Sequence, residues 1–309
     1  MEKDLQTLEK IKRDVLYGRE IVPPQVDTEK CIGCGQCVKV CPALVFELRE
    51  KKSEVIYGER CFACGHCWAV CPEGAVIQEE VATATGLKPG PEPAVSPDTL
   101  QLLIRERRST RLFKDKPVSK EQLRKIIEAG RYSPTATNRQ DVQYIVISNQ
   151  QNVAELRLLV ERFMEKTFKV MQNRAIAMLY RMKFGRSAED MLRYYAMGYQ
   201  FAKKSEEKHA YFPLPFGSAV LITHAQSFDT LAPFNCAVAL YNCSLMAHSL
   251  GLGSCFIGFV QVGANMDKKI KNWLEIPQQN QSYGAMVVGH PDVKYRRLVE
   301  RKMPDITWY

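Results

Sequence analysis

The chain has 309 residues and a formal net charge of +9, and hydrophobic residues make up 46% of it. This length exceeds what one small domain needs, so we expect two folded parts. No stretch of about 20 uninterrupted apolar residues occurs, and the charged segment 1–19 does not resemble a signal peptide. We therefore expect a cytoplasmic protein without a membrane-spanning helix.

The charge is divided unevenly along the chain. Residues 1–80 contain 11 basic and 14 acidic residues, whereas residues 81–309 contain 32 basic and 20 acidic residues. The basic second part suits an anionic cofactor and would attract an acidic redox partner. No nucleic-acid-binding motif and no alternating aromatic and basic run accompanies this charge, so we expect no nucleic-acid partner.

Two matching cysteine runs lie in the first part of the chain, at residues 31–42 and 61–72. Each has the spacing C-x2-C-x2-C-x3-C-P, which wraps a [4Fe–4S] cluster. Gly33, Gly35 and Gly65 allow the backbone angles that such a tight loop requires. The spacing therefore predicts two clusters and a role in carrying electrons.

The fourth cysteine of each run is expected to bind the cluster of the other run. The predicted ligand sets are Cys31, Cys34, Cys37 and Cys71 for one cluster, and Cys61, Cys64, Cys67 and Cys41 for the other. Structural zinc usually takes two separated C-x2-C pairs, and disulfides need an oxidising compartment, so both suit this pattern less well. With strands near 54–57 and 75–78, residues 27–80 resemble the two-cluster bacterial ferredoxin family and its pair of βαβ units.

A segment rich in proline and glycine follows at residues 81–97 and is predicted to be an extended linker. It separates an N-terminal extension and ferredoxin domain, residues 1–80, from a second domain, residues 98–309. Ser96 followed by proline predicts a helix that runs to about residue 108. Ser119 and Gln122 form a capping box for a second helix that ends near residue 130.

The remaining elements alternate between helix and strand. We expect strands at 144–148, 219–223 and 283–289, two or three helices within 151–210, and an apolar helix at 233–250. Helices around a few mixed strands give an α+β fold. A Rossmann domain is not expected, because no G-x-G-x-x-G motif follows a strand.

Four segments of the second domain carry residues suited to a phosphorylated, planar cofactor. Two arginine clusters, R-R-S-T-R at 107–111 and Y-R-R at 295–297, could clamp a phosphate. The polar loop at 133–140 offers amide groups to a heterocycle, and the glycine-containing turn at 251–258 allows close approach of the backbone. Each segment alone is a weak signal.

In this order, the four segments resemble the FMN-binding pattern of the nitroreductase family over about residues 99–309. The resemblance implies an FMN-binding nitroreductase-type α+β sandwich, built as an intertwined homodimer with FMN at the interface. It implies that the phosphate and ribityl chain contact Arg107, Arg108, Ser109 and Arg297, and that Arg111 lies near the flavin N1/O2 edge. It also implies that Phe256, Ile257 and Gly258 lie beside N5, and that the partner subunit supplies Pro134, Thr135, Ala136 and Asn138. Gln140 is a less secure match, because Asp141-Val142 replaces the Pro-Trp pair that often follows it.

The two resemblances together predict an FMN-dependent oxidoreductase that receives single electrons through the clusters. Its donor would be a low-potential protein such as a ferredoxin, and its acceptor a nitroaromatic, a quinone or an activated alkene. We name no catalytic side chain, because the chemistry belongs to the flavin. Two alternatives remain open: an NAD(P)H-driven nitroreductase whose clusters pass electrons outward, or a non-catalytic electron-transfer module of a larger complex.

Overall fold

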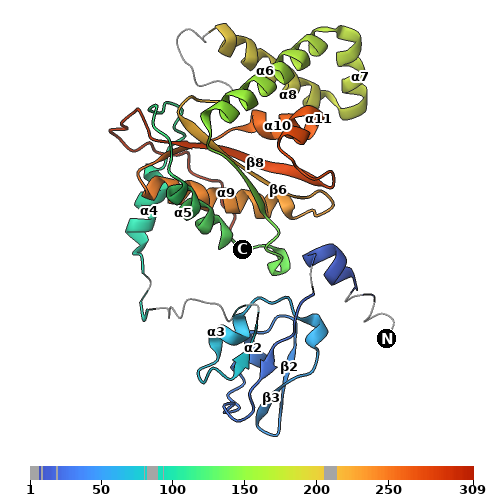
Figure 1. Ribbon diagram of the computed structural model, residues 1–309, viewed down its shortest axis with the longest axis vertical. Coiled ribbons are helices and arrows are strands. Elements are labelled where there is room, and N and C mark those ends of the chain that lie inside the picture. The colour runs from blue at the N-terminus through green and yellow to red at the C-terminus, as the bar shows by residue number, and fades with distance from the viewer. Residues whose placement is uncertain are drawn as a thin grey trace. The chain divides into compact units, whose positions relative to one another are not determined.

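A computed structural model describes residues 7, 10–18, 20–79, 81, 90–92, 94–204 and 214–309 (Figure 1). The chain forms two compact units. The first contains Met1–Ala94 and Pro134–Asp141, and the second contains Val95–Ser133 and Val142–Tyr309. Most of the linker expected at 81–97, and the end of the helical segment expected at 151–210, lie outside the described residues.

The first unit contains two small antiparallel sheets. Strand β1 (Gln25–Val26) pairs with β4 (Val76–Ile77), and β2 (Phe46–Arg49) pairs with β3 (Lys52–Val55). The helical segments are η1 (Lys12–Tyr17), α2 (Gln36–Val40), η2 (Gly58–Arg60) and α3 (His66–Val70). Cysteines of both runs pack with apolar side chains of the strands into a small core.

The two halves of this unit repeat the same backbone bends. Helices α2 and α3 each follow a glycine with positive φ, Gly35 at 68° and Gly65 at 75°. Two residues earlier, Gly33 has φ 71° and Ala63 has φ 49°. A Cβ atom at Gly33 would lie 2.0 Å from the carbonyl oxygen of Lys51, so this position accepts only glycine without rearrangement.

The second unit is built on one four-stranded sheet. Its strands are β5 (Gln143–Ile147), β6 (Ser218–Gln226), β7 (Gly253–Phe256) and β8 (Asn280–Gly289), in the order β5-β6-β8-β7. Every pair of these named strands is antiparallel, which corrects the expectation of mixed strands. β7 lies where the sequence indicated a turn, because Cys255 and its neighbours pair with β8.

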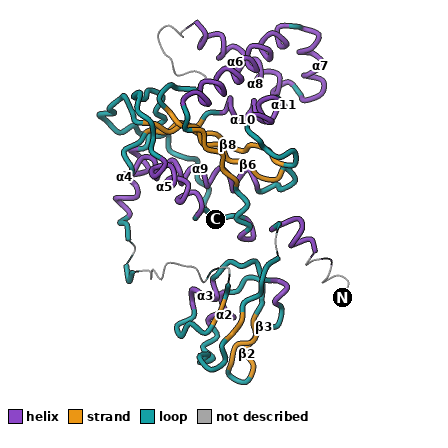
Figure 2. Tube along the Cα trace, in the orientation of Figure 1, coloured by secondary structure: helices purple, strands orange, loops and turns teal. Residues whose placement is uncertain are grey.

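Helices cover both faces of this sheet (Figures 1 and 2). On one face, α5 (Lys120–Arg131) and α9 (Ala232–Ser249) pack over one hydrophobic core. On the other face, a second core lies beneath α6 (Gln150–Gln172), α10 (Gly258–Met266) and α11 (Lys268–Trp273). Helices α4 (Pro97–Glu106), α7 (Arg174–Phe184) and α8 (Arg186–Lys204) complete the unit. The α+β sandwich expected from the sequence is confirmed.

Local signals account for the helix starts. The side chain of Ser96 accepts a hydrogen bond from the Thr99 backbone, and Ser119 and Gln122 form both bonds of the predicted capping box. Val118 and Leu123 are buried in one core, as a hydrophobic staple requires. Among the described residues, no helix is both long enough and apolar enough to span a membrane.

Candidate functional site

The first unit contains two cavities that are lined by cysteines. One is lined by Cys31, Cys34, Cys37 and Cys71, and the other by Cys41, Cys61, Cys64 and Cys67. Each cavity therefore takes three cysteines from one run and the fourth from the other run. This is the exchange that the sequence spacing predicts, so the structure brings both predicted ligand sets together.

Polar hydrogens point at the sulfur atoms of these cysteines. The backbone N–H groups of Val45 and Ala75 lie 3.4 and 3.2 Å from the Sγ atoms of Cys41 and Cys71, at matching places in the two halves. The Ala63 N–H lies 3.3 Å from the Cys61 sulfur. Such N–H groups stabilise negative charge on sulfur, as cluster-bound thiolates require.

Burial keeps the thiols of Cys61 and Cys67 protonated when no metal is bound. Burial raises the pKa of the Cys67 thiol to about 12 and also raises the pKa of Cys61. Metal ligation replaces such protons. No group of three or more His, Cys, Asp or Glu residues in the described part of the chain could hold a single metal ion. Four thiolates spread around a cluster do not need to converge on one point.

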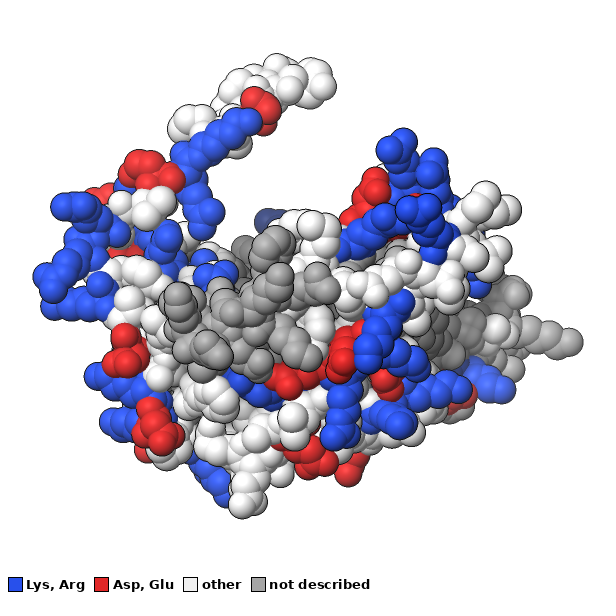
Figure 3. All heavy atoms as spheres, turned by 90° about the horizontal axis from the view of Figure 1, so that it is seen from above, with Lys and Arg blue, Asp and Glu red and all other residues white. Residues whose placement is uncertain are grey.

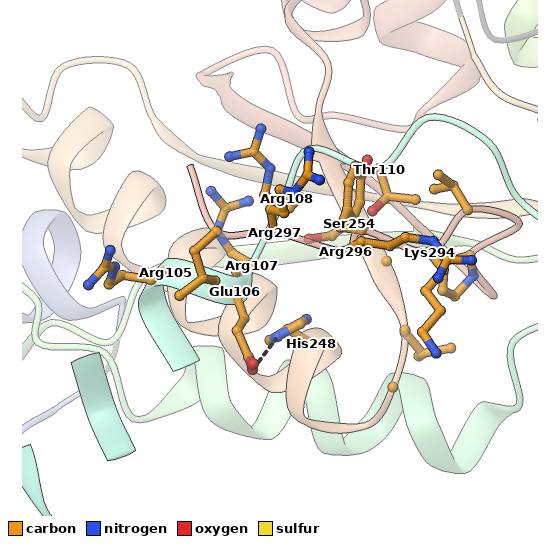
Figure 4. A pocket seen from close by; sticks show the side chains of 17 residues that line it. Arg105, Glu106, Arg107, Arg108, Thr110, His248, Ser254, Lys294, Arg296 and Arg297 are labelled. Atoms are coloured by element: carbon orange, nitrogen blue, oxygen red, sulfur yellow. Dashed lines mark ion pairs between the residues drawn. The ribbon is translucent and has the colours of Figure 1, made fainter. Parts of the chain in front are cut away.

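A larger cavity of about 450 Å³ lies in the second unit and is lined by arginines from two distant segments (Figure 4). Arg107 and Arg108 follow helix α4, whose last turn receives a hydrogen bond from the Arg107 N–H to Leu103 O. Arg297 comes from the C-terminal segment. The structure thus joins the two predicted arginine clusters at one site.

Backbone pairing explains how these segments meet. The Lys114 N–H donates to His290 O at 2.8 Å, and the Asp292 N–H donates to Leu112 O at 2.9 Å. Phe113 forms an isolated antiparallel bridge with Pro291. The chain beyond β8 is therefore held along residues 112–114, next to the first arginine cluster.

The cavity carries strong positive charge. Its basic residues are Arg105, Arg107, Arg108, Lys294, Arg296 and Arg297, against the single carboxylate of Glu106. His248 Nε2 lies 3.7 Å from that carboxylate, and Arg105 pairs with Glu300. Figure 3 shows Lys and Arg side chains gathered mainly toward the edges of the face that it draws, with fewer Asp and Glu side chains among them. An anion entering this cavity would meet several guanidinium groups.

Arg107 offers two buried donors that an anion could accept from. Its Nε and Nη1 atoms are buried and have no hydrogen-bond partner among the residues that the structure describes. A buried cation without a partner is costly. A phosphate group would satisfy these two donors in the forked geometry that arginine offers. The residues present therefore fit the phosphate end of a bound cofactor.

Strand β7 extends from this cavity toward the other predicted site residues. Ser109 forms a parallel bridge with Ser254, and Arg111 Nη1 donates to Ser109 O at 3.3 Å. Beyond the strand, Phe256 is exposed, and a Cβ atom at Gly258 would meet nothing within 4 Å. Ile257 lies between these two residues. The segment 256–258 thus has open space beside it, at the place where the sequence predicts the edge of the flavin ring.

Cys255 lies on the same strand beside Arg111 and Ser109. Burial raises the pKa of its thiol, while the nearby Arg111 and Arg107 charges act in the opposite direction. Cys236, Cys243 and Cys255 are all buried, so their thiols belong to the core of this unit.

The predicted polar loop belongs to the first unit. Residues 134–141 include the short 3-10 turn η3 (Ala136–Asn138), and the φ angles of Thr137, Asn138 and Gln140 are all positive. The Asn138 amide donates to the carbonyl oxygens of Phe62 and Ala63, at 3.3 and 2.8 Å. This loop therefore contacts the second cysteine run, a contact that the sequence did not indicate.

Comparison with known proteins identifies both parts of the chain. The nitroreductase family model matches residues 104–290, and a 4Fe-4S dicluster domain model matches residues 30–76. The chain belongs to the nitroreductase family.

The ferredoxin part is also similar to small ferredoxins. Ferredoxin-2 of Desulfomicrobium norvegicum is 61% identical over 28 residues, which cover 9% of this chain and 48% of that protein. The chain thus spans about half the length of the ferredoxins that it matches.

Solved structures resemble the nitroreductase part. The FMN-bound nitroreductase of Bacteroides fragilis is 21% identical, covering 67% of this chain and 98% of that one with a TM-score of 0.49. The FMN-bound nitroreductase of Desulfitobacterium hafniense is 20% identical, covering 69% and 100% with a TM-score of 0.48.

Several cavity residues of this nitroreductase were not among those predicted from the sequence. They are Arg105, Glu106, His248 and Lys294. Lys294 adjoins the predicted cluster 295–297, so a basic run was the available signal for it. His248 carries no such signal, because it reaches the cavity only through the packing of α9.

Proposed function

We propose that this nitroreductase is an FMN-dependent oxidoreductase that receives single electrons through two [4Fe–4S] clusters and passes electron pairs to a small acceptor. One observation carries the proposal. The same chain forms two four-cysteine cavities and a cationic cavity in which two buried donors of Arg107 have no hydrogen-bond partner among the described residues.

The eight cysteines of the two cavities are the proposed cluster ligands. The set from Cys31, Cys34, Cys37 and Cys71 would hold the first cluster, and the set from Cys61, Cys64, Cys67 and Cys41 the second. A [4Fe–4S] cluster carries one electron at a time. Two clusters in one unit form a relay between an external donor and the flavin.

The proposed FMN site combines the arginine cavity with strand β7, and the polar loop of a partner subunit would complete it. Arg107, Arg108 and Arg297 would hold the phosphate, and Ser109 the neighbouring ribityl chain. Arg111 would place positive charge near the N1/O2 edge of the ring, beside the segment Phe256–Gly258. Bound FMN supplies the chemistry by accepting single electrons and releasing them as a pair. The positive charge of Arg111 would stabilise the negative charge that builds up on the reduced ring.

The remaining site residues would come from the loop of a partner subunit. Pro134, Thr135, Ala136, Asn138 and Gln140 are the proposed contacts, in a homodimer with FMN at the subunit interface. The proposed acceptors are nitroaromatics, quinones or activated alkenes, and the proposed donor is a low-potential protein such as a ferredoxin. We place the protein in the cytoplasm, where thiolate ligands remain reduced.

Anaerobic bleaching of the flavin tests this proposal. Purified protein loaded with clusters and FMN is mixed with reduced ferredoxin in one cell and with NADPH in another. We expect rapid bleaching with ferredoxin and slow or no bleaching with NADPH, and loss of the ferredoxin reaction in Cys34→Ala. Rapid bleaching by NADPH that survives Cys34→Ala would instead show that the clusters are an outlet. No turnover with any acceptor, together with co-purifying proteins, would indicate an electron-transfer module.

A further inference from the structure

The two cysteine loops share one sequence pattern but differ in what covers them. In the first loop, Ile32 is 62% exposed and Cys34 is also exposed. At the matching positions of the second loop, Phe62 and Cys64 are half-buried. Ala63, between them, is only 4% exposed. The second loop is therefore covered at the place where the first loop is open.

The covering element is the loop 134–141, which lies in the same compact unit. The side-chain amide of Asn138 donates to two carbonyl oxygens of the second cysteine loop, Phe62 O at 3.3 Å and Ala63 O at 2.8 Å. From the N-terminal segment, the Tyr17 hydroxyl donates to Thr137 O at 2.8 Å. Two hydrogen bonds thus hold this loop against the residues between Cys61 and Cys64, and a third joins it to the N-terminal segment.

Positive charges accompany this contact. The Arg139 side chain is 6% exposed and lies 3.8 Å from the Asp141 carboxylate. Lys12 Nζ donates to Cys61 O at 2.6 Å. The Tyr17 side chain lies close to Arg139, Cys61 and Cys64.

We propose that the loop 134–141 is the contact through which the second cluster, held by Cys41, Cys61, Cys64 and Cys67, exchanges electrons with the flavin. The first cluster, behind the exposed loop, then receives electrons from the external donor. This inference rests on the proposed function, in which the same loop contacts FMN. Because electron transfer slows steeply with distance, the cluster whose loop touches the flavin-binding segment is the better outlet.

The electron balance of this relay is simple. The low-potential donor would lose one electron to the cluster held by Cys31, Cys34, Cys37 and Cys71. That cluster would be reoxidised by passing the electron to the cluster held by Cys41, Cys61, Cys64 and Cys67, which would in turn pass it to the flavin. Two such passes deliver the pair that the flavin needs, and its protons come from solvent.

The variant Asn138→Asp tests the contact with little change of shape. Aspartate tolerates positive φ nearly as well as asparagine, so the backbone at φ 53° can be kept. The change removes both donated hydrogen bonds and adds a negative charge beside the second loop. We expect the midpoint potential of the second cluster to fall while that of the first is unchanged. We also expect single-turnover transfer from clusters to flavin to slow about tenfold, as the loss of two hydrogen bonds implies.

Potentiometric titration followed by electron paramagnetic resonance measures the two potentials in the full-length, cofactor-loaded protein. Cys34→Ser and Cys64→Ser variants assign each signal to its loop. Asn149→Asp is the matched charge control. Asn149 caps α6 by accepting from the N–H groups of Gln151 and Asn152, and aspartate caps a helix equally well. It should move neither potential nor the transfer rate.

The variant Tyr17→Phe separates the effect of weakening the loop contact from the effect of the added negative charge. It removes only the hydrogen bond to Thr137 O, so it should slow transfer without the shift in potential that the new carboxylate causes. FMN content and direct flavin reduction by dithionite are measured in each variant. Unchanged potentials and transfer rates in both Asn138→Asp and Tyr17→Phe would overturn the inference. Loss of FMN from Asn138→Asp with an unchanged second potential would also overturn it, because Asn138 would then serve the flavin alone. If the wild-type protein binds no FMN, or transfers no electrons to it, the proposed function itself would be contradicted.

Discussion

The cysteine cavities of the first unit and the arginine cavity of the second unit are built in different ways. Each cysteine cavity takes three ligands from one short loop, whose bends depend on residues with positive φ. The arginine cavity joins residues 107–108 to residues 294–297, and it exists because residues 112–114 pair with residues 290–292. The first kind of site depends on single loop residues, whereas the second depends on the fold of a whole unit.

The largest expected effect concerns which of the two flavins in the dimer receives electrons from each ferredoxin unit. The loop 134–141 contacts its own cysteine loop. In the proposed homodimer, that loop touches the flavin whose phosphate is held by the partner's Arg107. Consider a mixed dimer in which one subunit carries Cys64→Ala and the other carries Arg107→Ala and Arg297→Ala. Its one remaining flavin is held by the arginines of the Cys64→Ala subunit and would receive electrons from the intact clusters of the other subunit. This flavin should therefore be reduced at the wild-type rate. Stopped-flow bleaching with reduced ferredoxin measures this rate.

The reciprocal dimer provides the control. Here one subunit carries all three substitutions and the other is wild type, so the remaining flavin would be served by the damaged clusters. We expect no fast bleaching in this dimer. The opposite pair of results would show that each ferredoxin unit serves the flavin of its own subunit.

The next effect sharpens the contrast between the two cysteine loops. In Gly33→Ala, the new Cβ atom would lie 2.0 Å from Lys51 O at φ 71°. The first loop cannot then close, and iron analysis should fall from about eight to about four atoms per chain, as loss of one cluster requires. Gly74→Ala is the control, because Gly74 has φ 61° but nothing within 4 Å. Full iron content in Gly33→Ala would show that the loop rearranges.

A smaller effect is expected at the arginine cavity. Arg107→Ala removes two buried donors, and hydrogen bonds to charged groups contribute about 1.5–3 kcal/mol. The dissociation constant for FMN should therefore rise about ten- to a hundredfold, as measured by recovery of flavin fluorescence. Arg105→Ala, whose ion pair with Glu300 is at the surface, should change affinity only slightly. Equal effects of the two variants would mean that total charge, not the buried Arg107 donors, holds the anion.

The sequence allowed much of this architecture to be predicted, because the decisive signals were local. The cysteine spacing alone predicted which four cysteines surround each cavity, and Ser96 and Ser119 marked the starts of α4 and α5. β7 was missed, because its strand character comes from pairing with β8 across the sheet. The contact of Asn138 with Ala63 was also missed, because it joins residues 75 positions apart and no pattern at either end indicates it.

The smallest effect separates the stabilities of the two units. Ser119→Ala removes the capping box of α5, in which Ser119 Oγ accepts from the Gln122 N–H at 3.1 Å. The second unit should lose about 1 kcal/mol of unfolding free energy. Because the arginine cavity depends on the fold of this unit, the temperature at which FMN is released should fall in a thermal melt. The temperature at which cluster absorbance is lost should stay the same, and Ser119→Asp should restore the wild-type melt because aspartate also caps. If both transitions move together, the cysteine cavities also depend on the second unit, and the contrast between a local and an assembled site breaks down.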